Sequence, residues 1–399
     1  MDARPKHSSY DVVIIGGAIM GSSTAWFLTQ NSDFDGRVLV VERDPSYEFS
    51  STAHTNSCIR QQFSTKLNIQ ISQFAAAFIK ELPERMADDR IPRLGVQNYG
   101  YMYLADTEEF ANVLRANQDV QVAMGAETEI LDPKEIAARY PFYQLEDIVA
   151  GSINLKDEGY WDGGTLFEWL RRKAVDNGAE YIANEVTAMD VKGTRVDSVT
   201  LTSGEVISCG QVVNATGPRA GKTAAMVGLD IPVEPRKRFT WIFEAEKPLS
   251  IELPLTIDPS GVHMRQDGPK TYLAGCPADP DPAVPFGDFA MDHGRWQDHV
   301  WPIIATRIPQ FDAIRVITEW AGHYAYNTLD QNALLGALPE VENFVFQNGF
   351  SGHGLQQSPA MGRGTAEWLT YGEYRSLDLS PFDVGRVLAN APIVERAVI

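Results

Sequence analysis

Apolar residues form two short runs near the start of the chain, and a glycine-rich turn and a helical pattern lie between them. The first run, residues 10–15, is almost wholly apolar and ends at the turn, which is typical of a buried parallel strand. Residues 22–30 then predict a helix, and a second apolar run covers residues 38–41 and ends at Glu42. The pattern therefore predicts a strand, a turn, a helix and a second strand in that order.

The small residues of this turn indicate a dinucleotide-binding site, with one departure from the usual pattern. Gly16 permits the tight turn, and Gly21 allows the helix to pack closely on the strand. The methyl group of Ala18 stands where the backbone approaches a pyrophosphate, and it crowds that approach slightly. Glu42 follows Gly21 by 21 positions and is placed to accept hydrogen bonds from ribose hydroxyls. The alternative, an ordinary turn in an α/β core, is disfavoured by the correct context on both sides.

The middle of the chain lacks this strand-helix-strand order and indicates a second domain. Residues 97–105 alternate like a strand, residues 107–124 have a helical pattern, and residues 231–276 have the pattern of successive strands. No low-complexity linker separates these regions, so we expect two domains that are interleaved in sequence. The expected division gives residues 10–90, 145–228 and 325–399 to a nucleotide-binding domain, residues 91–144 and 229–324 to a substrate-binding domain, and residues 1–9 to an N-terminal tail.

Composition and charge argue against several classes of partner. The chain has 399 residues, of which 44% are hydrophobic and 22% charged, as in a globular protein. The net charge of −19 disfavours nucleic acid or an anionic membrane as a partner, and no apolar run is long enough to predict a membrane span. The first residues lack the apolar core of a secretory signal, so we expect a cytoplasmic protein. The widely spaced Cys58, Cys209 and Cys276 predict neither a metal site nor a disulfide framework.

Two later turns rich in small residues are further places where backbone could approach a ligand closely. One of them, residues 215–217, follows the apolar strand over residues 211–214. The other, residues 348–354, connects a short strand to a helix over residues 355–369, and it lacks the spacing of a nucleotide fingerprint. Because no second fingerprint occurs, we expect no separate NAD(P)H-binding domain.

Five long passages together resemble the D-amino-acid oxidase and sarcosine oxidase superfamily of flavoproteins. Within it, the chain is most similar to the branch of the FAD-dependent oxidoreductase domain-containing proteins. The passages are spread over nearly the whole chain, so they identify the family more specifically than any single glycine turn does. They are VLVVERD (38–44), RQQFS (60–64), PVEPRKR (232–238), WAGHYAYNTLDQN (320–332) and GFSGHGLQQSPAMGR (349–363).

The resemblance implies an α/β fold, of the α+β two-domain kind, with a Rossmann-like FAD-binding domain and an interleaved substrate domain built on a large mixed β-sheet. It implies FAD along the first strand-turn-helix unit, with the flavin ring at the interface of the domains. We expect this FAD to be bound non-covalently, because the chain departs from the family pattern at the attachment residue described below. Similar enzymes oxidise the C–N bond of a carboxylate-bearing secondary or tertiary amine by hydride transfer to flavin N5, and water hydrolyses the imine. Electrons then leave to oxygen, a quinone or an electron-transfer protein. The alternatives are a flavin-bound assembly factor with secondary redox activity and a flavoprotein that oxidises 2-hydroxyacids.

The resemblance also implies which residues hold the cofactor. The start of the last helix would supply N–H groups and a positive dipole end to the negative charge that the reduced flavin carries at N1 and the C2 oxygen. The expected cofactor-binding residues are Gly16, Gly17, Ala18, Ile19, Met20, Gly21, Glu42, Arg43, Ser51, Thr52, His54, Arg60, Gln61, Val186, Ala215, Thr216, Gly217, Gly352, His353, Gly354, Leu355 and Gln356.

Arg60 is the first candidate for binding the substrate carboxylate, because a guanidinium binds a carboxylate through a bidentate fork. Its segment resembles the arginine-bearing loop of the family. Arg238 and Arg265 are second choices, and the alternative for the basic cluster 236–238 is a surface or phosphate-facing charge.

Tyr324, Tyr326, His353 and Gln356 complete the expected catalytic set with Arg60. The two tyrosines alternate on a strand and would face the same side, where they either line the flavin pocket or fill core with their hydroxyls at the rim. His353 is either an acid/base residue or part of a segment chosen for backbone shape and cofactor contact.

Two departures from the sarcosine oxidase pattern bear on the substrate and on the flavin. A lysine that helps to hold the substrate carboxylate in those enzymes falls at Gln356, which puts simple sarcosine specificity in doubt. The cysteine that fixes the flavin covalently there falls at His323, which argues against a cysteinyl flavin. A histidyl bond through His323 or His54 is the remaining covalent alternative.

Overall fold

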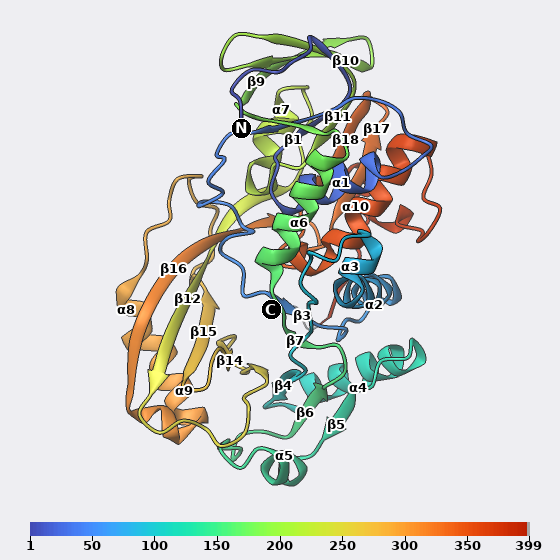
Figure 1. Cartoon of the computed structure of the whole chain (residues 1–399). Helices are drawn as coiled ribbons and strands as arrows, with labels where there is room; N and C mark the ends of the chain where they lie inside the picture. The colour runs from blue at the N-terminus through green and yellow to red at the C-terminus, as the bar shows by residue number, and fades with distance from the viewer. Residues whose placement is uncertain (397–399) are drawn as a thin grey trace.

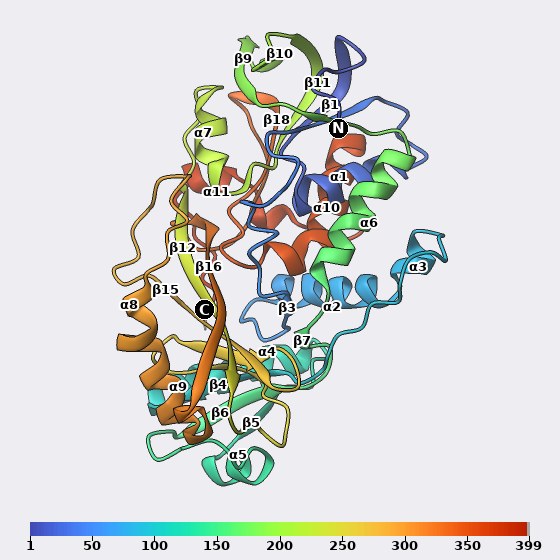
Figure 2. The same ribbon diagram turned by 60° about the vertical axis from the view of Figure 1, so that its left-hand side comes forward.

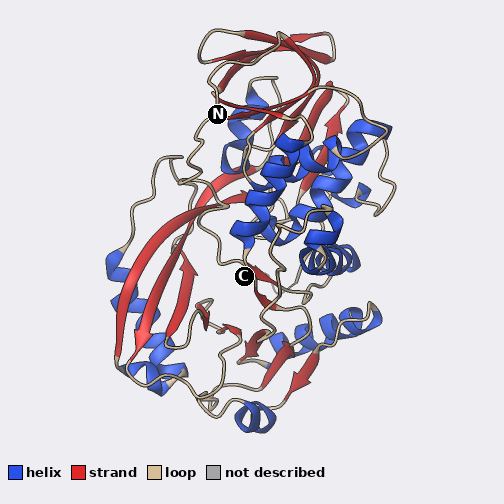
Figure 3. Cartoon of the chain, in the orientation of Figure 1, coloured by secondary structure: helices blue, strands red, loops and turns tan. Residues whose placement is uncertain are grey.

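The computed structural model describes residues 1–396 and arranges them around two eight-stranded sheets, with a two-stranded sheet between them (Figure 1). Figure 3 shows the long strands of the second sheet at the lower left, with helices at their outer side, and its short strands along the bottom of the molecule. The mixed architecture with two large sheets confirms the fold class expected from the sequence. Among the helices of the described residues, none combines the length and the apolar character that crossing a membrane requires.

The first sheet has a parallel centre with antiparallel additions at its sides. Its strand order is β17-β18-β11-β1-β2-β8, and β10 pairs with β11 and β9. The pairs formed by β1 with β2 and β11, by β11 with β18 and by β2 with β8 are parallel. The strands are β1 (Ser9–Ile15), β2 (Val38–Glu42), β8 (Glu180–Ala183), β9 (Val186–Lys192), β10 (Arg195–Leu201), β11 (Val206–Asn214), β17 (Leu334–Leu338) and β18 (Val341–Asn348).

The second sheet is mostly antiparallel and draws its strands from the middle of the chain. Its order is β16-β12-β15-β14-β13-β4-β6-β5, and β3 (Cys58–Ile59) pairs with β7 (Gly159–Tyr160) in the small sheet. The strands are β4 (Tyr101–Ala105), β5 (Glu129–Leu131), β6 (Ala150–Asn154), β12 (Val233–Ala245), β13 (Leu255–Ile257), β14 (His263–Gln266), β15 (Thr271–Pro277) and β16 (Ile314–Asn327).

The helices cover both sheets. Figure 2 shows α1, α6 and α10 together beside the first sheet, and α8 and α9 at the outer side of the second. The helices are α1 (Ile19–Thr29), α2 (Lys66–Lys80), α3 (Leu82–Arg85), α4 (Glu108–Ala123), α5 (Pro133–Arg139), α6 (Gly163–Asp176), α7 (Ala220–Ala225), α8 (His293–Arg295), α9 (Trp301–Arg307), α10 (Gly354–Tyr371) and α11 (Gly385–Leu388).

Alternating side chains of the first strand explain why helices cover both faces of the first sheet. Val12 and Ile14 belong to one apolar core, which includes residues of α1, α6 and α10. Val13 and Ile15 belong to a second core on the opposite face, which includes residues of α7 and the β9–β10 hairpin. Since successive side chains of a strand point to opposite faces, a wholly apolar strand is buried on both sides.

The opening elements agree closely with the sequence pattern, but the N-terminal residues do not form a free tail. Strands β1 and β2 lie where the apolar runs predict them, and α1 begins at Ile19, three residues earlier than the predicted residue 22. Asp2 forms a β-bridge with Ile182, and the Lys6 N–H donates to the carboxylate of Glu180 over 2.7 Å. The expected tail therefore lies against the edge strand β8.

The domain boundaries remain a prediction. Two strands, β6 and β16, do not follow the expected division. Strand β6 pairs with β4 and β5 in the second sheet, whereas the sequence division gives residues 145–228 to the nucleotide-binding domain. Strand β16 crosses the expected boundary between residues 324 and 325 without interruption.

The C-terminal segment is bound at the start of α2 through Glu395. Its carboxylate accepts hydrogen bonds from the Ser64 N–H, from the Thr65 hydroxyl over 2.8 Å and from the Asn68 amide over 2.9 Å. Thr65 is the N-cap residue of α2 but provides no side-chain cap of its own. Glu395 therefore binds the residues around the helix start and places a negative charge at the positive end of the helix dipole.

We expect Glu395→Gln to lower the free energy of unfolding by about 1 kcal/mol, because the variant loses the negative charge at the helix N-terminus and one acceptor for the segment 64–68. Urea or thermal denaturation measures the change. The exposed Glu373, which pairs with Arg375 on the surface, is a matched control: Glu373→Gln is expected to change the free energy by less than about 0.5 kcal/mol. Equal stability of the two variants would contradict the capping role.

Candidate functional site

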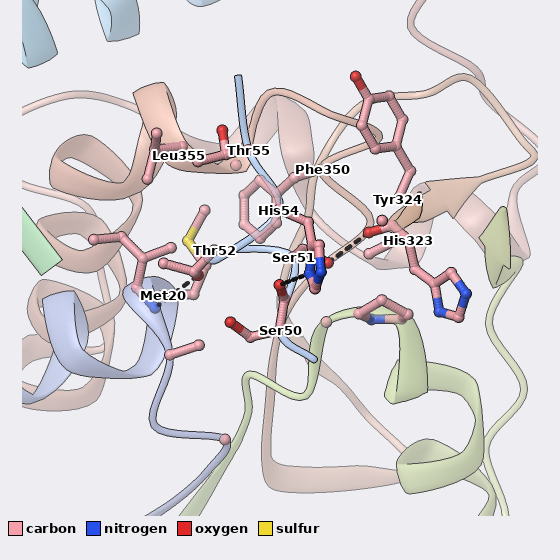
Figure 4. A pocket seen from close by; sticks show the side chains of 18 of the residues that line it. Met20, Ser50, Ser51, Thr52, His54, Thr55, His323, Tyr324, Phe350 and Leu355 are labelled. Carbon is pink, nitrogen blue, oxygen red and sulfur yellow. Dashed lines mark hydrogen bonds between the residues drawn. The ribbon is translucent and has the colours of Figure 1, made fainter. Parts of the chain in front are cut away.

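A single long cavity runs from the first sheet to the second and is lined by segments far apart in the sequence. It begins at Glu42, passes the turn after β1 and the turn after β11, and continues to the start of α10. Its far end is lined by residues of the second sheet, including Thr240, Leu255 and His263. Figure 4 shows part of this cavity, with Met20 and Thr52 near one end and His323 and Tyr324 near the other.

The turn after β1 needs glycine at two positions. Gly16 has φ of +98°, in the left-handed region that favours glycine, and its α-carbon lies against the Ala215 carbonyl. A Cβ at Gly21 would overlap the Gly16 carbonyl oxygen, so α1 packs on the turn more closely than any side chain allows. These are the turn and packing roles that the sequence pattern assigns to the two residues.

Glu42 fixes this turn from the end of β2. One carboxylate oxygen accepts the Gly17 N–H over 2.8 Å, and the other accepts the Asp44 N–H over 2.8 Å. Burial raises the pKa of Glu42 above its usual value, while the two N–H groups oppose that change. Each oxygen keeps one lone pair that a ribose hydroxyl could use.

The N-terminus of α1 is open to the cavity. Its N-cap is Ala18, which provides no side-chain cap, and the Ile19 N–H donates to the Thr52 hydroxyl over 3.3 Å (Figure 4). Ala18, Ile19 and Met20 all line the cavity. Free N–H groups and the positive end of the helix dipole therefore meet the cavity where a pyrophosphate would lie, and Ala18 does not close it.

The start of α10 forms the other half of the cofactor cradle. Its N-cap is His353, again without a side-chain cap. Gly352 has φ of +97°, and a Cβ at this position would collide with the ring of Tyr324. The backbone conformation and the contact with Tyr324 therefore require glycine at position 352. The positive end of the α10 dipole is directed at the cavity.

The cavity fits FAD in chemistry and in shape. One end offers carboxylate acceptors for a ribose, the middle offers uncapped helix N–H groups for phosphates, and the far end offers a second uncapped helix with aromatic neighbours for a flat ring.

Arg60 and His353, both expected to be catalytic, are hydrogen-bonded partners. Arg60 is only 1% exposed, and its Nη2 donates to His353 Nε2 over 3.0 Å. Its Nη1 donates to the Gln62 carbonyl, and its guanidinium carbon lies 4.0 Å from the centre of the Phe63 ring. Within residues 1–396, no acidic side chain forms an ion pair with Arg60.

His353 is a neutral ring in this position. Burial and the Arg60 charge lower its pKa to about 3. Because Nε2 accepts from Arg60, the hydrogen-bond pattern assigns the ring proton to Nδ1. His353 therefore does not act as a protonated acid near neutral pH.

Gln356 ties the Arg60 segment to α2. Its side-chain oxygen accepts the Arg60 backbone N–H over 3.0 Å, and its Nε2 donates to the Ser72 hydroxyl over 3.2 Å. The side chain lines the cavity at 4% exposure. Gln356 therefore positions the backbone of Arg60.

The two candidate tyrosines differ in their access to the cavity. Tyr324 lines it and packs on Gly352, whereas Tyr326 lies 4.1 Å from the guanidinium of Arg236 and does not line it. The guanidinium of Arg238 lies 4.6 Å from the Tyr324 ring and 5.7 Å from the Tyr326 ring.

The basic cluster 236–238 holds an acidic loop in place. Arg238 pairs with Asp281 over 2.9 Å, and Lys237 pairs with Asp288 over 2.7 Å. This loop carries Phe289 into the cavity wall, a contact that the sequence pattern did not indicate. The cluster is thus neutralised within the protein.

His54 and His323 both pack against this loop through Phe289. Their rings stack on Phe289 with centroid distances of 5.7 and 4.2 Å. His54 Nδ1 contacts the Ser50 carbonyl at 3.1 Å, and His323 Nε2 contacts the Asp288 carbonyl at 2.8 Å. Figure 4 shows both rings, with His323 also held through its own carbonyl by the Ser51 hydroxyl.

Most of the expected site residues meet in this one cavity. Gly17, Gly21, Gln61 and Tyr326 do not line it: the first two shape the turn behind it, and Gln61 donates to the Lys156 carbonyl over 2.9 Å. The expected residues that line the cavity are Gly16, Ala18, Ile19, Met20, Glu42, Arg43, Ser51, Thr52, His54, Arg60, Val186, Ala215, Thr216, Gly217, Tyr324, Gly352, His353, Gly354, Leu355 and Gln356.

Several residues that line the substrate end come from the second sheet and were not predicted. Tyr101, Thr240 and His263 lie on strands whose sequence shows only alternation, which identifies a face but not the face that meets a cavity. Burial and the charges of Arg265 and Arg238 lower the pKa of His263 to about 4, so this ring is neutral too.

Comparison with known proteins agrees with this geometry. A family model described as FAD dependent oxidoreductase, DAO, matches residues 11–368. FAD-dependent oxidoreductase domain-containing protein 1 of Xenopus laevis is 35% identical over 98% of this chain and 85% of that protein. Glycine oxidase of Geobacillus kaustophilus is 26% identical over 94% of this chain and 97% of that protein. The crystal structure of L-proline dehydrogenase from P. horikoshii has a TM-score of 0.82 at 24% identity, and the match covers 98% of this chain and all of that chain (100%). The chain belongs to the DAO family of FAD-dependent oxidoreductases.

Proposed function

We propose that the protein oxidises the C–N bond of a carboxylate-bearing secondary or tertiary amine, using non-covalently bound FAD. The observation that carries this proposal is the buried Arg60 guanidinium, which lines the cavity beside the start of α10 and has no ion-pair partner among residues 1–396. The names of the relatives support it, since they include sarcosine dehydrogenase, glycine oxidase and L-proline dehydrogenase.

A buried guanidinium that no carboxylate contacts directly is costly, and a substrate carboxylate in contact with it would offset that cost. Removing one charge of a buried pair destabilises a protein by about 3–5 kcal/mol, because the remaining charge is desolvated and unpaired. The Arg60 guanidinium is held by Gln62 and His353, and its backbone N–H is held by Gln356, so its orientation is set before a ligand arrives. A preorganised fork binds a carboxylate with little further loss of side-chain freedom.

The same positive surroundings favour the reactive form of the substrate amine. Arg60 lines the cavity without an ion-pair partner among residues 1–396, and nearby positive charge lowers the pKa of an ammonium group. The amine then loses its proton to water and keeps a lone pair on nitrogen. No side-chain base is needed for this step, which fits the neutral but hydrogen-bonded His353.

The start of α10 supplies the remaining electrostatic requirement. Bound FAD supplies the chemistry of hydride acceptance at N5. Backbone N–H groups of residues 352–355 and the α10 dipole would stabilise negative charge on the ring, and they are already in place. Phe289 and Tyr324 would exclude water from the side of the cavity they line.

Anaerobic mixing of the FAD-loaded protein with a panel of amines tests the proposal. We expect N-methyl or N-carboxyalkyl amino acids to bleach the flavin absorbance, which oxygen or an artificial acceptor then restores. Amines of the same size without the carboxylate are the control and are expected to bleach it far more slowly. Bleaching by 2-hydroxyacids alone would move the assignment to hydroxyacid oxidation, and no bleaching by any member would favour a flavin-bound binding protein.

Arg60→Met should raise the concentration of carboxylate-bearing amine needed for half-maximal flavin reduction by about 30-fold, because a charged hydrogen bond contributes about 2 kcal/mol. Reduction by the amine that lacks a carboxylate should change little. Arg115→Met, which removes an exposed arginine from α4, is the control and should behave as the unaltered protein. Equal losses for both kinds of amine would show that Arg60 supports the fold of the site without binding the carboxylate.

Gly21→Ala should weaken FAD binding at least about tenfold, which corresponds to about 1.4 kcal/mol, because the added methyl group overlaps the Gly16 carbonyl and opens the turn. Equilibrium dialysis of the apoprotein against FAD measures the dissociation constant. Gly95→Ala is the control, since a Cβ there meets no atom within 4 Å. Unchanged FAD affinity in Gly21→Ala would remove this turn from the cofactor site.

A further inference from the structure

Glu158 is a fully buried acid directly behind the proposed substrate site. It lies at 0% exposure in the turn-rich passage before α6, immediately before β7. In the antiparallel pair of β3 and β7, Cys58 faces Tyr160 and Ile59 faces Gly159. The same register places Glu158 opposite Arg60, so the two ionisable residues are cross-strand neighbours.

The carboxylate of Glu158 holds the segment that follows Arg60. It accepts the Gln61 N–H over 2.6 Å, the Gln62 side-chain amide over 2.9 Å and the Asn154 amide over 3.0 Å. The Gln62 carbonyl in turn accepts from the Arg60 guanidinium. Glu158 is thus connected to His353 at the cavity through two residues. It binds the side chain of Gln62, the carbonyl of Gln62 binds Arg60, and Arg60 binds His353.

We propose that Glu158 is a positioning residue for the amine-oxidising site, and that it is the internal counter-charge of Arg60 until the carboxylate of the substrate takes over that role. The inference rests on the proposed function, because it assumes that Arg60 binds an anionic substrate. It adds that binding of the anion is coupled to uptake of a proton by Glu158.

The coupling has a definite sign. Burial raises the pKa of Glu158 to about 7, and its hydrogen bonds and Arg60 oppose that rise. A second anion beside Arg60 raises the pKa of Glu158 further, since like charges disfavour each other. Binding is therefore tightest below about pH 7, where Glu158 is already neutral, and it weakens as the pH rises through that value.

The other groups around Glu158 do not titrate in this range. Arg60 lies opposite it just after β3, and Tyr101 and Tyr103 are close to it from β4. Burial raises the pKa of Tyr101 and Tyr103 above their usual values. Asn154 on β6 does not ionise.

Binding of methoxyacetate to the FAD-loaded protein tests the inference without turnover. This ligand carries one carboxylate, has no amine and does not titrate between pH 6 and 8. We expect its dissociation constant, measured by calorimetry or by the change in flavin absorbance, to rise at least fivefold from pH 6 to pH 8. The uncharged amide of the same acid is the control ligand and should show no such trend.

Glu158→Gln should reduce that change to less than twofold, with an affinity close to that of the unaltered protein at pH 6. Glu127→Gln removes an exposed acid that pairs with Lys156, and it should keep the full dependence. A Glu158→Gln protein that keeps the fivefold change would overturn the inference.

Calorimetry of the unaltered protein in two buffers of different ionisation enthalpy gives a second measurement, which does not depend on the folding of a variant. We expect proton uptake on methoxyacetate binding at pH 7, and no uptake would overturn the inference. A protein that takes up the proton but is bleached by no amine would keep this inference and lose the proposed oxidation, so the two failures are distinguishable.

Discussion

The parallel pairing of β1 with β2 and β11, and of β11 with β18, determines where every part of the cofactor cavity lies. In this pairing Ile15 is opposite Asn214 and Val41, and Asn214 is opposite Phe346, so the carboxyl ends of four strands meet at one edge of the sheet. The turns that leave this edge are those of residues 16–21, 215–217 and 349–354, together with Glu42. Three segments separated by more than a hundred residues each therefore line one cavity, as ligand sites of open α/β sheets do.

The second sheet closes this cavity and removes the positive charge of Arg60 from water. It buries Arg60 between the start of α10 and the strands β3 and β4, next to Phe63 and Tyr103. A guanidinium in such surroundings is retained at a cost in stability, which is common at functional sites. The hydrogen bonds from Arg60 to Gln62 and His353 satisfy its donors but do not neutralise its charge.

The sequence predicts the turns that line the cavity at one end and several residues at the other, such as Arg60 and Tyr324, but not all of the residues that surround Arg60. Local spacing determines the roles of Gly16, Gly21 and Glu42, because these residues act within one strand-turn-helix-strand unit. Glu158 has no such local signal: the strand that follows it, β7, has two residues, and its partners Gln61 and Gln62 are nearly a hundred positions away. The same holds for Phe289, which a loop brings over the cavity, and for the first residues, which pair with β8. Contacts of this kind depend on tertiary packing, which periodicity does not encode.

The charges around the substrate end explain how oxidation could proceed there without a side-chain base. His353 and His263 are both neutral because burial and neighbouring guanidinium groups lower their pKa values. A neutral ring bound to Arg60 cannot supply a proton, and its Nε2 lone pair is already used. In the proposed reaction, Arg60 would instead act directly on the bound molecule: it would attract the carboxylate and favour the neutral amine. Because the positive charge that would bind the anion would also prepare the amine, Arg60 would link recognition to reactivity, and Glu158 behind it would determine at which pH that charge is available.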